Sequence, residues 1–202
     1  WFGGGKVASN GLQECVDKAR AASDWDNRKS RTAPKGKRRG TGVALAAHIS
    51  GLLGTGAIIR VFEDGSVALN TGAVDIGQGS DTVLSQMCAE ALKIPLEKVS
   101  LASPDTDGSP YNWGTTASRV TYTTGRAVVG AAAEVEKQLK EHAAQMLECS
   151  EMDLELRPGG IVGVSGSDKE VSFHQISLRA HWAAGGPIVG CPLYPSDAAD
   201  AP

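Results

Sequence analysis

Apolar and polar residues alternate on both sides of a turn at Asp64-Gly65. The run over residues 57–62 is rich in β-branched and other apolar residues, and Val67 and Leu69 alternate with polar neighbours after the turn. Two such runs joined by an Asp-Gly turn predict a β-hairpin. Beyond Gly79, apolar residues recur at the spacing of an amphipathic helix, at Val83, Leu84, Met87, Ala91 and Leu92. The predicted order is therefore strand, turn, strand, glycine-rich loop and helix.

The same patterns predict the other elements of the chain. They indicate a helix over residues 12–19 with Asn10 as its N-cap, a short strand over 99–102, a long helix over 120–146, a hairpin that turns at 158–160, and a helix from Ser172. Short strands that alternate with helices in this way predict an α+β fold, in which small hairpins and sheets carry packed helices.

Composition narrows the range of partners. The 202 residues carry a net charge of −3 and few aromatic residues, and no apolar run is long enough to span a membrane. We therefore expect neither a nucleic-acid nor a membrane partner. The basic cluster at residues 35–39 follows Pro34 and is typical of a solvated loop. Four widely spaced cysteines without a Cys-x-x-Cys pair predict reduced thiols in a cytoplasmic protein, rather than zinc or iron–sulfur ligands.

The loop between the hairpin and its following helix contains Gly77-Gln78-Gly79. Glycine lets a backbone turn tightly and approach a ligand closely. The first amides of a helix have no partner within the helix and suit an anion, while the Gln78 amide suits the edge of a heterocycle. A Gly-x-Gly motif also serves as a simple tight turn, so both interpretations stand.

A second segment of this kind precedes the long helix. Thr115, Thr116 and Ser118 can cap that helix, or their hydroxyls and the free amides can bind phosphate oxygens. Two such helix starts in one small domain suggest a shared polyanionic ligand. Asp105 and Asp107 do not complete a calcium loop, because the other ligands of an EF-hand are missing at their required offsets.

Several segments occur together, in order and at sensible spacing: Asp75-Ile76-Gly77-Gln78-Gly79 with Thr82 and Gln86, then Asp105-Thr106-Asp107 and Thr116-Ala117-Ser118-Arg119. This pattern resembles the molybdopterin-binding subunit of the molybdenum hydroxylases. That family comprises xanthine dehydrogenase, aldehyde oxidase and aerobic carbon monoxide dehydrogenase. The resemblance runs from about Leu12 to Gly190.

The resemblance implies roles for particular residues. It implies contact with the molybdopterin cofactor, in its plain or its dinucleotide form, for Ile76, Gly77, Gln78, Gly79, Thr115, Thr116, Ala117, Ser118 and Thr121. It makes Ala47 and His48 candidates for the substrate pocket, Asp75 a support for the glycine loop, and residues 42–47 a strand. It assigns no catalytic residue and no metal ligand to this chain.

The resemblance also implies an activity and a set of partners. Family members hydroxylate a carbon of an aldehyde or N-heterocycle with oxygen from water, together with further molybdenum domains and with iron–sulfur and FAD subunits or domains. Their glutamate base lies in a Gly-Glu-Pro-type segment, which is missing from this sequence, as are their Gly-Gly-Phe-Gly-Gly and Arg-x-Phe-Gly segments. We therefore expect residues 1–190 to be a partial molybdopterin-binding domain cut at both ends, with an irregular tail over 191–202. By itself the chain is expected to be inactive and to form homo-oligomers.

Two other interpretations use the same residues. In the first, the chain is a non-catalytic binding or interaction module whose loops hold another anion. In the second, the glycine loops are only turns and the hydroxyl groups are only helix caps.

Overall fold

The computed structural model describes residues 9–46, 48, 50–51, 53–182 and 185–194. The chain divides into two units, Trp1–Ala47 and His48–Pro202, where the sequence suggested one domain over residues 1–190. The boundaries of the molybdopterin-binding domain itself stay a prediction.

In its described residues, the N-terminal unit contains one α-helix followed by a 3-10 helix, which are α1 (Leu12–Ala22) and η2 (Trp25–Ser30). The predicted first helix is confirmed, but its N-cap is Gly11 rather than Asn10, whose side chain accepts a hydrogen bond from the Leu12 amide at 2.9 Å. No residue of α1 is buried. The predicted strand over residues 42–47 is wrong for the described residues 42–46, which form no strand. A strand needs a neighbour to pair its backbone groups, and no described strand lies against this segment.

A mixed sheet forms the centre of the second unit. Its strands are β1 (Thr55–Val61), β2 (Val67–Thr71), β3 (Val99–Leu101) and β7 (Val189–Gly190), in the spatial order β3-β2-β1-β7. The predicted hairpin is confirmed: β1 and β2 pair antiparallel, with Val61 opposite Val67 at the turn. The Asp64 side chain closes this turn by accepting from the amide and hydroxyl of Ser66. Strand β3 runs parallel to β2, which requires a crossover between them.

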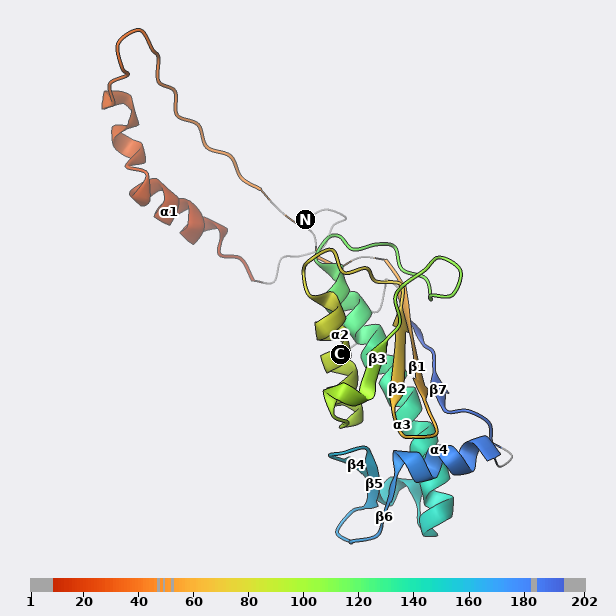
Figure 1. The fold of residues 1–202 in the computed structure, drawn as a ribbon. Helices are drawn as coiled ribbons and strands as arrows, with labels where there is room; N and C mark the ends of the chain where they lie inside the picture. Colours follow the sequence, from red (N-terminus) through yellow and green to blue (C-terminus); the bar gives the residue numbers. More distant parts are fainter. Residues whose placement is uncertain (1–8, 47, 49, 52, 183–184, 195–202) are drawn as a thin grey trace. The chain divides into compact units, whose positions relative to one another are not determined.

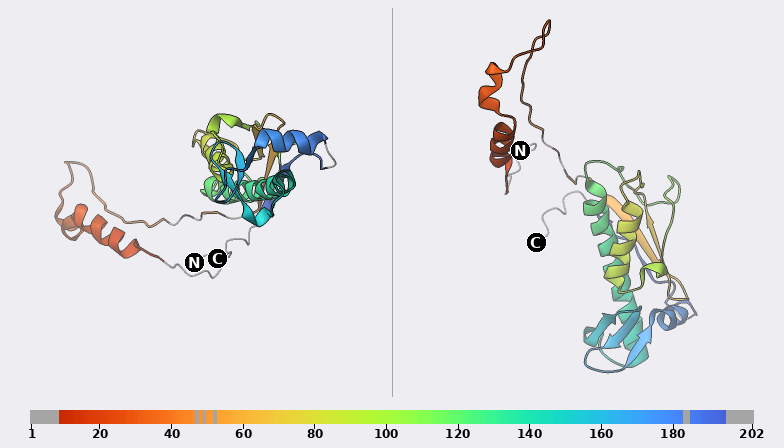
Figure 2. Two further views of the ribbon diagram at one scale, coloured as in Figure 1. Left: turned by 90° about the horizontal axis from the view of Figure 1, so that it is seen from below. Right: turned by 60° about the vertical axis from the view of Figure 1, so that its left-hand side comes forward.

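Two helices cover one face of this sheet, as Figures 1 and 2 show. They are α2 (Ser80–Leu92), which makes the crossover from β2 to β3, and α3 (Gly125–Leu147). Alternate residues of β1 point toward these helices, so that Ala57, Ile59 and Val61 are buried while Arg60 is exposed. The missing side chain at Gly125 lets α3 lie close to Met87 of α2, and Ala131 joins the β1 side chains in one apolar core.

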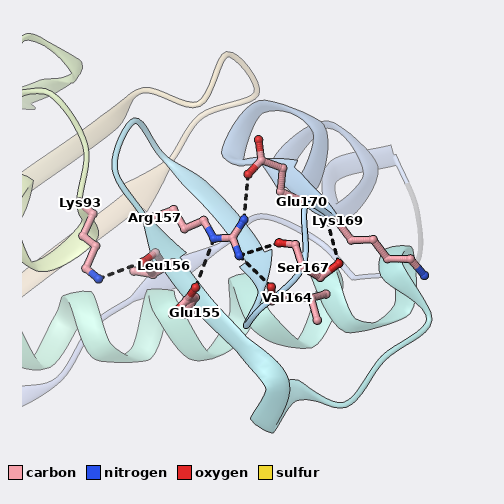
Figure 3. Close-up of polar contacts among 8 residues, drawn as sticks. All are labelled: Lys93, Glu155, Leu156, Arg157, Val164, Ser167, Lys169 and Glu170. Atoms are coloured by element: carbon pink, nitrogen blue, oxygen red, sulfur yellow. Dashed lines mark hydrogen bonds and ion pairs between the residues drawn. The ribbon is translucent and has the colours of Figure 1, made fainter.

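A small antiparallel sheet forms the other end of the unit. Its strands are β4 (Leu154–Arg157), β5 (Ile161–Val164) and β6 (Glu170–Ser172), followed by α4 (Phe173–Trp182). The Arg157 guanidinium binds carboxylates on β4 and β6, from Glu155 and Glu170, as Figure 3 shows. It also donates to two backbone carbonyls of the β5–β6 turn, those of Val164 and Ser167. One side chain therefore holds all three strands together.

Lys93 joins the small sheet to the end of α2. It ends α2 in the left-handed conformation with φ of 53°, and its carbonyl accepts from the amides of Gly159 and Gly160 in the β4–β5 turn. Its ammonium group donates to the Leu156 carbonyl at 2.9 Å (Figure 3). The end of α2 thereby fixes the position of the second hairpin.

Two elements differ from the sequence prediction. The long helix begins with five residues of π-helix, η4 (Val120–Thr124), and becomes α-helical only at Gly125. In the region predicted to be an irregular tail, Leu193–Tyr194 forms β8, which pairs with Thr55 and Gly56 at the start of β1. Pattern analysis does not detect a two-residue strand, because its only cause is the backbone of a partner far away in the sequence.

Candidate functional site

The two segments predicted to bind a ligand lie against each other. One is the loop of residues 72–79 between β2 and α2, called here the glycine loop, and the other is residues 112–119, called the hydroxyl loop. The Thr115 hydroxyl donates to the Val74 carbonyl at 2.7 Å and accepts from the Val74 amide at 3.2 Å. The loops also meet closely at Gly72, where an added Cβ atom would lie 2.9 Å from the Asn112 Cβ atom.

Asp75 holds the glycine loop from inside. One carboxylate oxygen accepts from the amides of Gly77 and Gly79, at 2.8 and 3.3 Å, and the other accepts from the Asp81 amide at 3.2 Å. These backbone hydrogen bonds lower the pKa of Asp75 below its ordinary value, with the Gly77 amide as the largest cause. The supporting role expected for Asp75 agrees with this geometry.

The Gln78 side chain is folded back onto its own loop. Its carbonyl oxygen accepts from the Ile76 amide at 2.7 Å, and its NH2 group donates to the Ser80 hydroxyl at 2.8 Å and the Val74 carbonyl at 3.3 Å. The Gln78 side-chain amide, which the sequence predicted to contact the edge of a heterocycle, therefore stabilises the turn in this structure. Its role toward a ligand stays a prediction.

Both glycines of the loop adopt backbone conformations that suit glycine. Their φ angles are 103° at Gly77 and 79° at Gly79, in the left-handed region where a Cβ atom is strained. No heavy atom lies within 4 Å of the position that a Cβ would take at either residue, and the same holds at Gly114 in the hydroxyl loop. The backbone of both loops is therefore open to a flat group from outside.

The hydroxyl loop does not cap the helix that follows it. The residue before the π-helix is Arg119, and no side chain forms a capping hydrogen bond there, so capping by Thr115, Thr116 or Ser118 is wrong. Ala117 and Ser118 instead have φ of 47° and 49°, two successive left-handed residues that turn the backbone sharply. Thr116, Ser118 and Thr121 are exposed, and among the described residues their hydroxyls have no hydrogen-bond partner.

Arg119 lies beneath the hydroxyl loop and is fully buried. Its guanidinium donates to the Asn112 side chain at 2.8 Å and to backbone carbonyls at Gly114, Leu53 and Gly54, between 3.0 and 3.1 Å. Burial lowers the pKa of this group from its ordinary value. Arg119 thus ties the hydroxyl loop to the segment that leads into β1.

The sequence motifs gave no separate role to Arg119. It was only the last residue of the segment Thr116-Ala117-Ser118-Arg119. A signal was present, because an arginine directly before an apolar helical run must either reach solvent or find several acceptors. The acceptors come from loops far away in the sequence, so the pattern alone cannot show which of these occurs.

The two candidates for the substrate pocket are only partly described. Ala47 lies outside the described residues, and His48 is exposed. Three residues after His48, the Gly51 amide donates to the Ala117 carbonyl at 3.0 Å. The segment that carries His48 therefore runs into direct contact with the hydroxyl loop.

Comparison with known proteins identifies the family of this arrangement. The family model of the molybdopterin cofactor-binding domain matches residues 18–199. The chain belongs to this family. The resemblance to molybdenum hydroxylases expected from the sequence is thereby confirmed, and the matched residues include both loops.

Among curated relatives, the putative xanthine dehydrogenase molybdenum-binding subunit of Escherichia coli is 38% identical over 188 residues, covering 89% of this chain and 25% of the relative. The 6-hydroxypseudooxynicotine dehydrogenase complex subunit gamma of Paenarthrobacter nicotinovorans is 34% identical and covers 77% of this chain and 20% of the relative. The chain thus spans about a quarter or less of these relatives.

Solved structures share the fold of this molybdopterin-binding family member. Carbon monoxide dehydrogenase from Oligotropha carboxidovorans superposes with a TM-score of 0.64 at 23% identity, over 93% of this chain and 25% of that one. Quinoline 2-oxidoreductase from Pseudomonas putida 86 gives a TM-score of 0.62 at 25% identity, over 72% of this chain and 19% of that one. The predicted α+β class is confirmed by these neighbours.

Proposed function

We propose that this chain forms the molybdopterin-contacting portion of a molybdenum hydroxylase, with the glycine loop and the hydroxyl loop as its contact surface. The observation that carries the proposal is the pair of hydrogen bonds between Thr115 and Val74, which sets the two loops side by side. Family resemblance assigns the cofactor to both loops. A single ligand that touches one of them is then within reach of the other.

The residues present fit such a ligand. A molybdopterin is a flat polar ring system that ends in a phosphate, and the open backbone at Gly77, Gly79 and Gly114 leaves room for a flat group. The free hydroxyls of Thr116, Ser118 and Thr121 supply donors for oxygen atoms of a ligand. Ile76, which is 72% exposed, and Trp113, which is 49% exposed, offer apolar surface beside them. Residues Gln78, Thr115 and Ala117 position the backbone of the loops.

When bound, the cofactor supplies the redox chemistry by which the parent enzyme would hydroxylate a carbon of an aldehyde or an N-heterocycle with oxygen from water. The residues of this chain bind and orient it. Asp75 and Arg119 keep the two loops in place from below, through hydrogen bonds to their backbone. The names of the relatives, which include a xanthine dehydrogenase subunit and a quinoline oxidoreductase, support a heterocyclic substrate.

The test removes hydroxyls that carry no structural bond. In the full-length parent enzyme, the double variant Thr116→Val with Ser118→Ala should lose at least about half of its cofactor, since each lost hydrogen bond weakens binding by about 1 kcal/mol. Molybdenum content by elemental analysis and pterin content by fluorescence measure this loss. Thermal stability of the apoprotein should stay within about 1 °C, because the hydroxyls have no partner in the described chain.

A matched control keeps this test specific. Ser165 is exposed in the turn between β5 and β6, and Ser165→Ala should leave cofactor content unchanged. Cofactor content equal to wild type in the double variant would contradict the proposed contact of the hydroxyl loop. Loss in the control as well would trace the effect to general instability rather than to contact.

We further propose that His48 faces the substrate of the parent enzyme. Its exposure and its place beside the Gly51–Ala117 contact support this role. His48→Ala in the intact enzyme should change the ratio of kcat/KM between a purine and an aldehyde by at least about threefold, at constant molybdenum content. Equal ratios in variant and wild type would remove His48 from the pocket.

The remaining proposals concern partners and location. Relatives named as a subunit gamma and as a large chain support assembly with other molybdenum domains and with iron–sulfur and FAD subunits. Four cysteines without disulfides support a cytoplasmic location. In the described part of the chain, no helix is long and apolar enough to cross a membrane. Exposed Val43 and Leu45 support homo-oligomers of the isolated chain, which light scattering would detect.

A further inference from the structure

The start of α2 already holds an anion, and that anion is part of the chain. A glycine-rich loop that leads into a helix usually offers free amides to a phosphate or carboxylate. Here the amides of Gly77, Gly79 and Asp81 all point to the Asp75 carboxylate, at 2.8 to 3.3 Å. The carboxylate thus occupies the position that the oxygens of a bound phosphate would take.

A second side chain occupies another backbone donor of the loop. The Ile76 amide donates to the Gln78 side chain at 2.7 Å. Four backbone amides, those of Ile76, Gly77 and Gly79 in the glycine loop and of Asp81 in α2, therefore have acceptors from the glycine loop. A phosphate could reach them only by displacing Asp75 or Gln78.

Negative charge at the start of α2 also disfavours a phosphate there. Asp75 stays ionised at neutral pH because three amides stabilise its charged form. Asp81 adds another carboxylate in the first turn of α2. An incoming phosphate would meet two negative charges at the start of α2, while the amides of Gly77, Gly79 and Asp81 already donate to Asp75. Uncharged polar groups meet no such repulsion.

We propose that Asp75 is a positioning and selectivity-determining residue, an internal anion that holds the glycine loop open for an uncharged polar ring and excludes phosphate groups from the start of α2. The identity of that ring as part of a molybdopterin rests on the proposed function; the exclusion of phosphate does not. The charged end of a bound cofactor is then directed away from Asp75, toward groups such as the free hydroxyls of Thr116 and Ser118.

The test is a titration of the 202-residue chain with inorganic phosphate, followed by amide NMR at constant ionic strength and pH 7. In wild type, the amide resonances of Gly77, Gly79 and Asp81 should not move in a saturable way. In Asp75→Ala, they should shift with saturation, and phosphate should bind at least about tenfold more tightly, equivalent to 1.4 kcal/mol. Saturable binding at these amides in wild type would overturn the proposal.

A second variant tests the proposal even if the glycine loop loses its structure in Asp75→Ala. Asp75→Asn keeps one acceptor oxygen for Gly77 and Gly79 but removes the charge and the acceptor for Asp81. Phosphate should then shift the Asp81 amide most, with the loop retained. If neither variant gains phosphate binding over wild type, Asp75 does not exclude phosphate. Cofactor content of the Thr116 and Ser118 variants is unaffected by this result, so the two proposals fail independently.

The Asp75→Asn variant also distinguishes exclusion of phosphate from simple stabilisation of the turn. If Asp75 only stabilised the turn, Asp75→Asn would behave like wild type toward phosphate, because it retains the bonds to both glycines. An excess of sulfate should compete with phosphate in both variants, since both anions present tetrahedral oxygens. Binding of phosphate without competition by sulfate would contradict an amide site for anions.

Discussion

The Thr115 hydroxyl and the Val74 backbone form a closed pair, in which the hydroxyl donates to the carbonyl and accepts from the amide of the same residue. The Thr115 hydroxyl thus makes the same two hydrogen bonds to Val74 that a residue on a neighbouring antiparallel strand would make through its backbone. It joins loops 41 residues apart in the sequence. The candidate cofactor surface is therefore a property of two loops held together, and the Thr115 hydroxyl forms the direct hydrogen bonds between them.

Replacing Thr115 with valine should separate the two loops. Valine keeps the shape but leaves both backbone groups of Val74 without their partner, and we expect a loss of about 1–3 kcal/mol in the free energy of unfolding. Urea denaturation of the 202-residue chain measures this. Thr115→Ser retains the hydroxyl and should lose less than half as much. Equal losses in the two variants would show that the methyl group, not the hydroxyl, matters.

Arg119 is predicted to be the most sensitive charged residue of the site. Arg119→Lys keeps the charge but cannot reach acceptors on both sides, so it should lower the free energy of unfolding by at least about 2 kcal/mol. Arg60→Lys is the matched control: Arg60 is exposed and stacks on Phe62, and its replacement should cost less than about 1 kcal/mol. Similar losses at both positions would contradict the central role of Arg119.

Gly72 should tolerate no side chain. A Cβ atom there would lie 2.5 Å from the Pro110 carbonyl oxygen and 2.9 Å from the Asn112 Cβ atom, so Gly72→Ala must push the hydroxyl loop away. We expect a loss of about 1–3 kcal/mol and weaker binding of cofactor in the parent enzyme. Gly42→Ala is the control, because nothing lies within 4 Å of its Cβ position. A wild-type melting temperature for Gly72→Ala would show that the loops move apart without cost.

The glycine loop should loosen in acid. The pKa of Asp75 is lowered from 3.8 by its bonds to backbone amides, so its stabilising effect is complete above that value and is lost as pH falls through the lower, folded-state pKa. The amide shifts of Gly77 and Gly79 should therefore titrate together, with a midpoint below pH 3.8. Asp75→Asn should abolish this transition, and Asp81→Asn should preserve it. A midpoint above 3.8 would mean that the carboxylate is not held by the amides.

The purified 202-residue chain should not hydroxylate purines or aldehydes. The sequence holds no Gly-Glu-Pro-type segment, which in the resembling family supplies the base, and proton removal by a positioned base is needed for such a reaction. Dye reduction with xanthine and with an aldehyde, alongside elemental analysis for molybdenum, measures this. Turnover together with stoichiometric molybdenum would refute the prediction, whereas the intact parent enzyme should be active under the same conditions.

Local patterns were sufficient for most of the secondary structure. Alternation around Asp64-Gly65 predicted the β1–β2 hairpin, and helical spacing predicted α2 and the greater part of α3, because burial on one face imposes these periods directly. The motif Asp75-Ile76-Gly77-Gln78-Gly79, together with the later segments, was sufficient to indicate the family. Each of these signals lies within a few neighbouring residues.

Tertiary structure decided how the candidate site is built. Thr115 could have capped a helix, but it bonds Val74 instead, and Arg119 gathers acceptors from segments as far as 66 residues away. The Asp75 carboxylate binds the amides at the start of α2, because it is tethered next to them and therefore has a high local concentration. Hydrogen bonds between distant segments leave no periodic trace in a sequence. The sequence therefore determined which groups are available, and the fold determined which of them are already bound to one another.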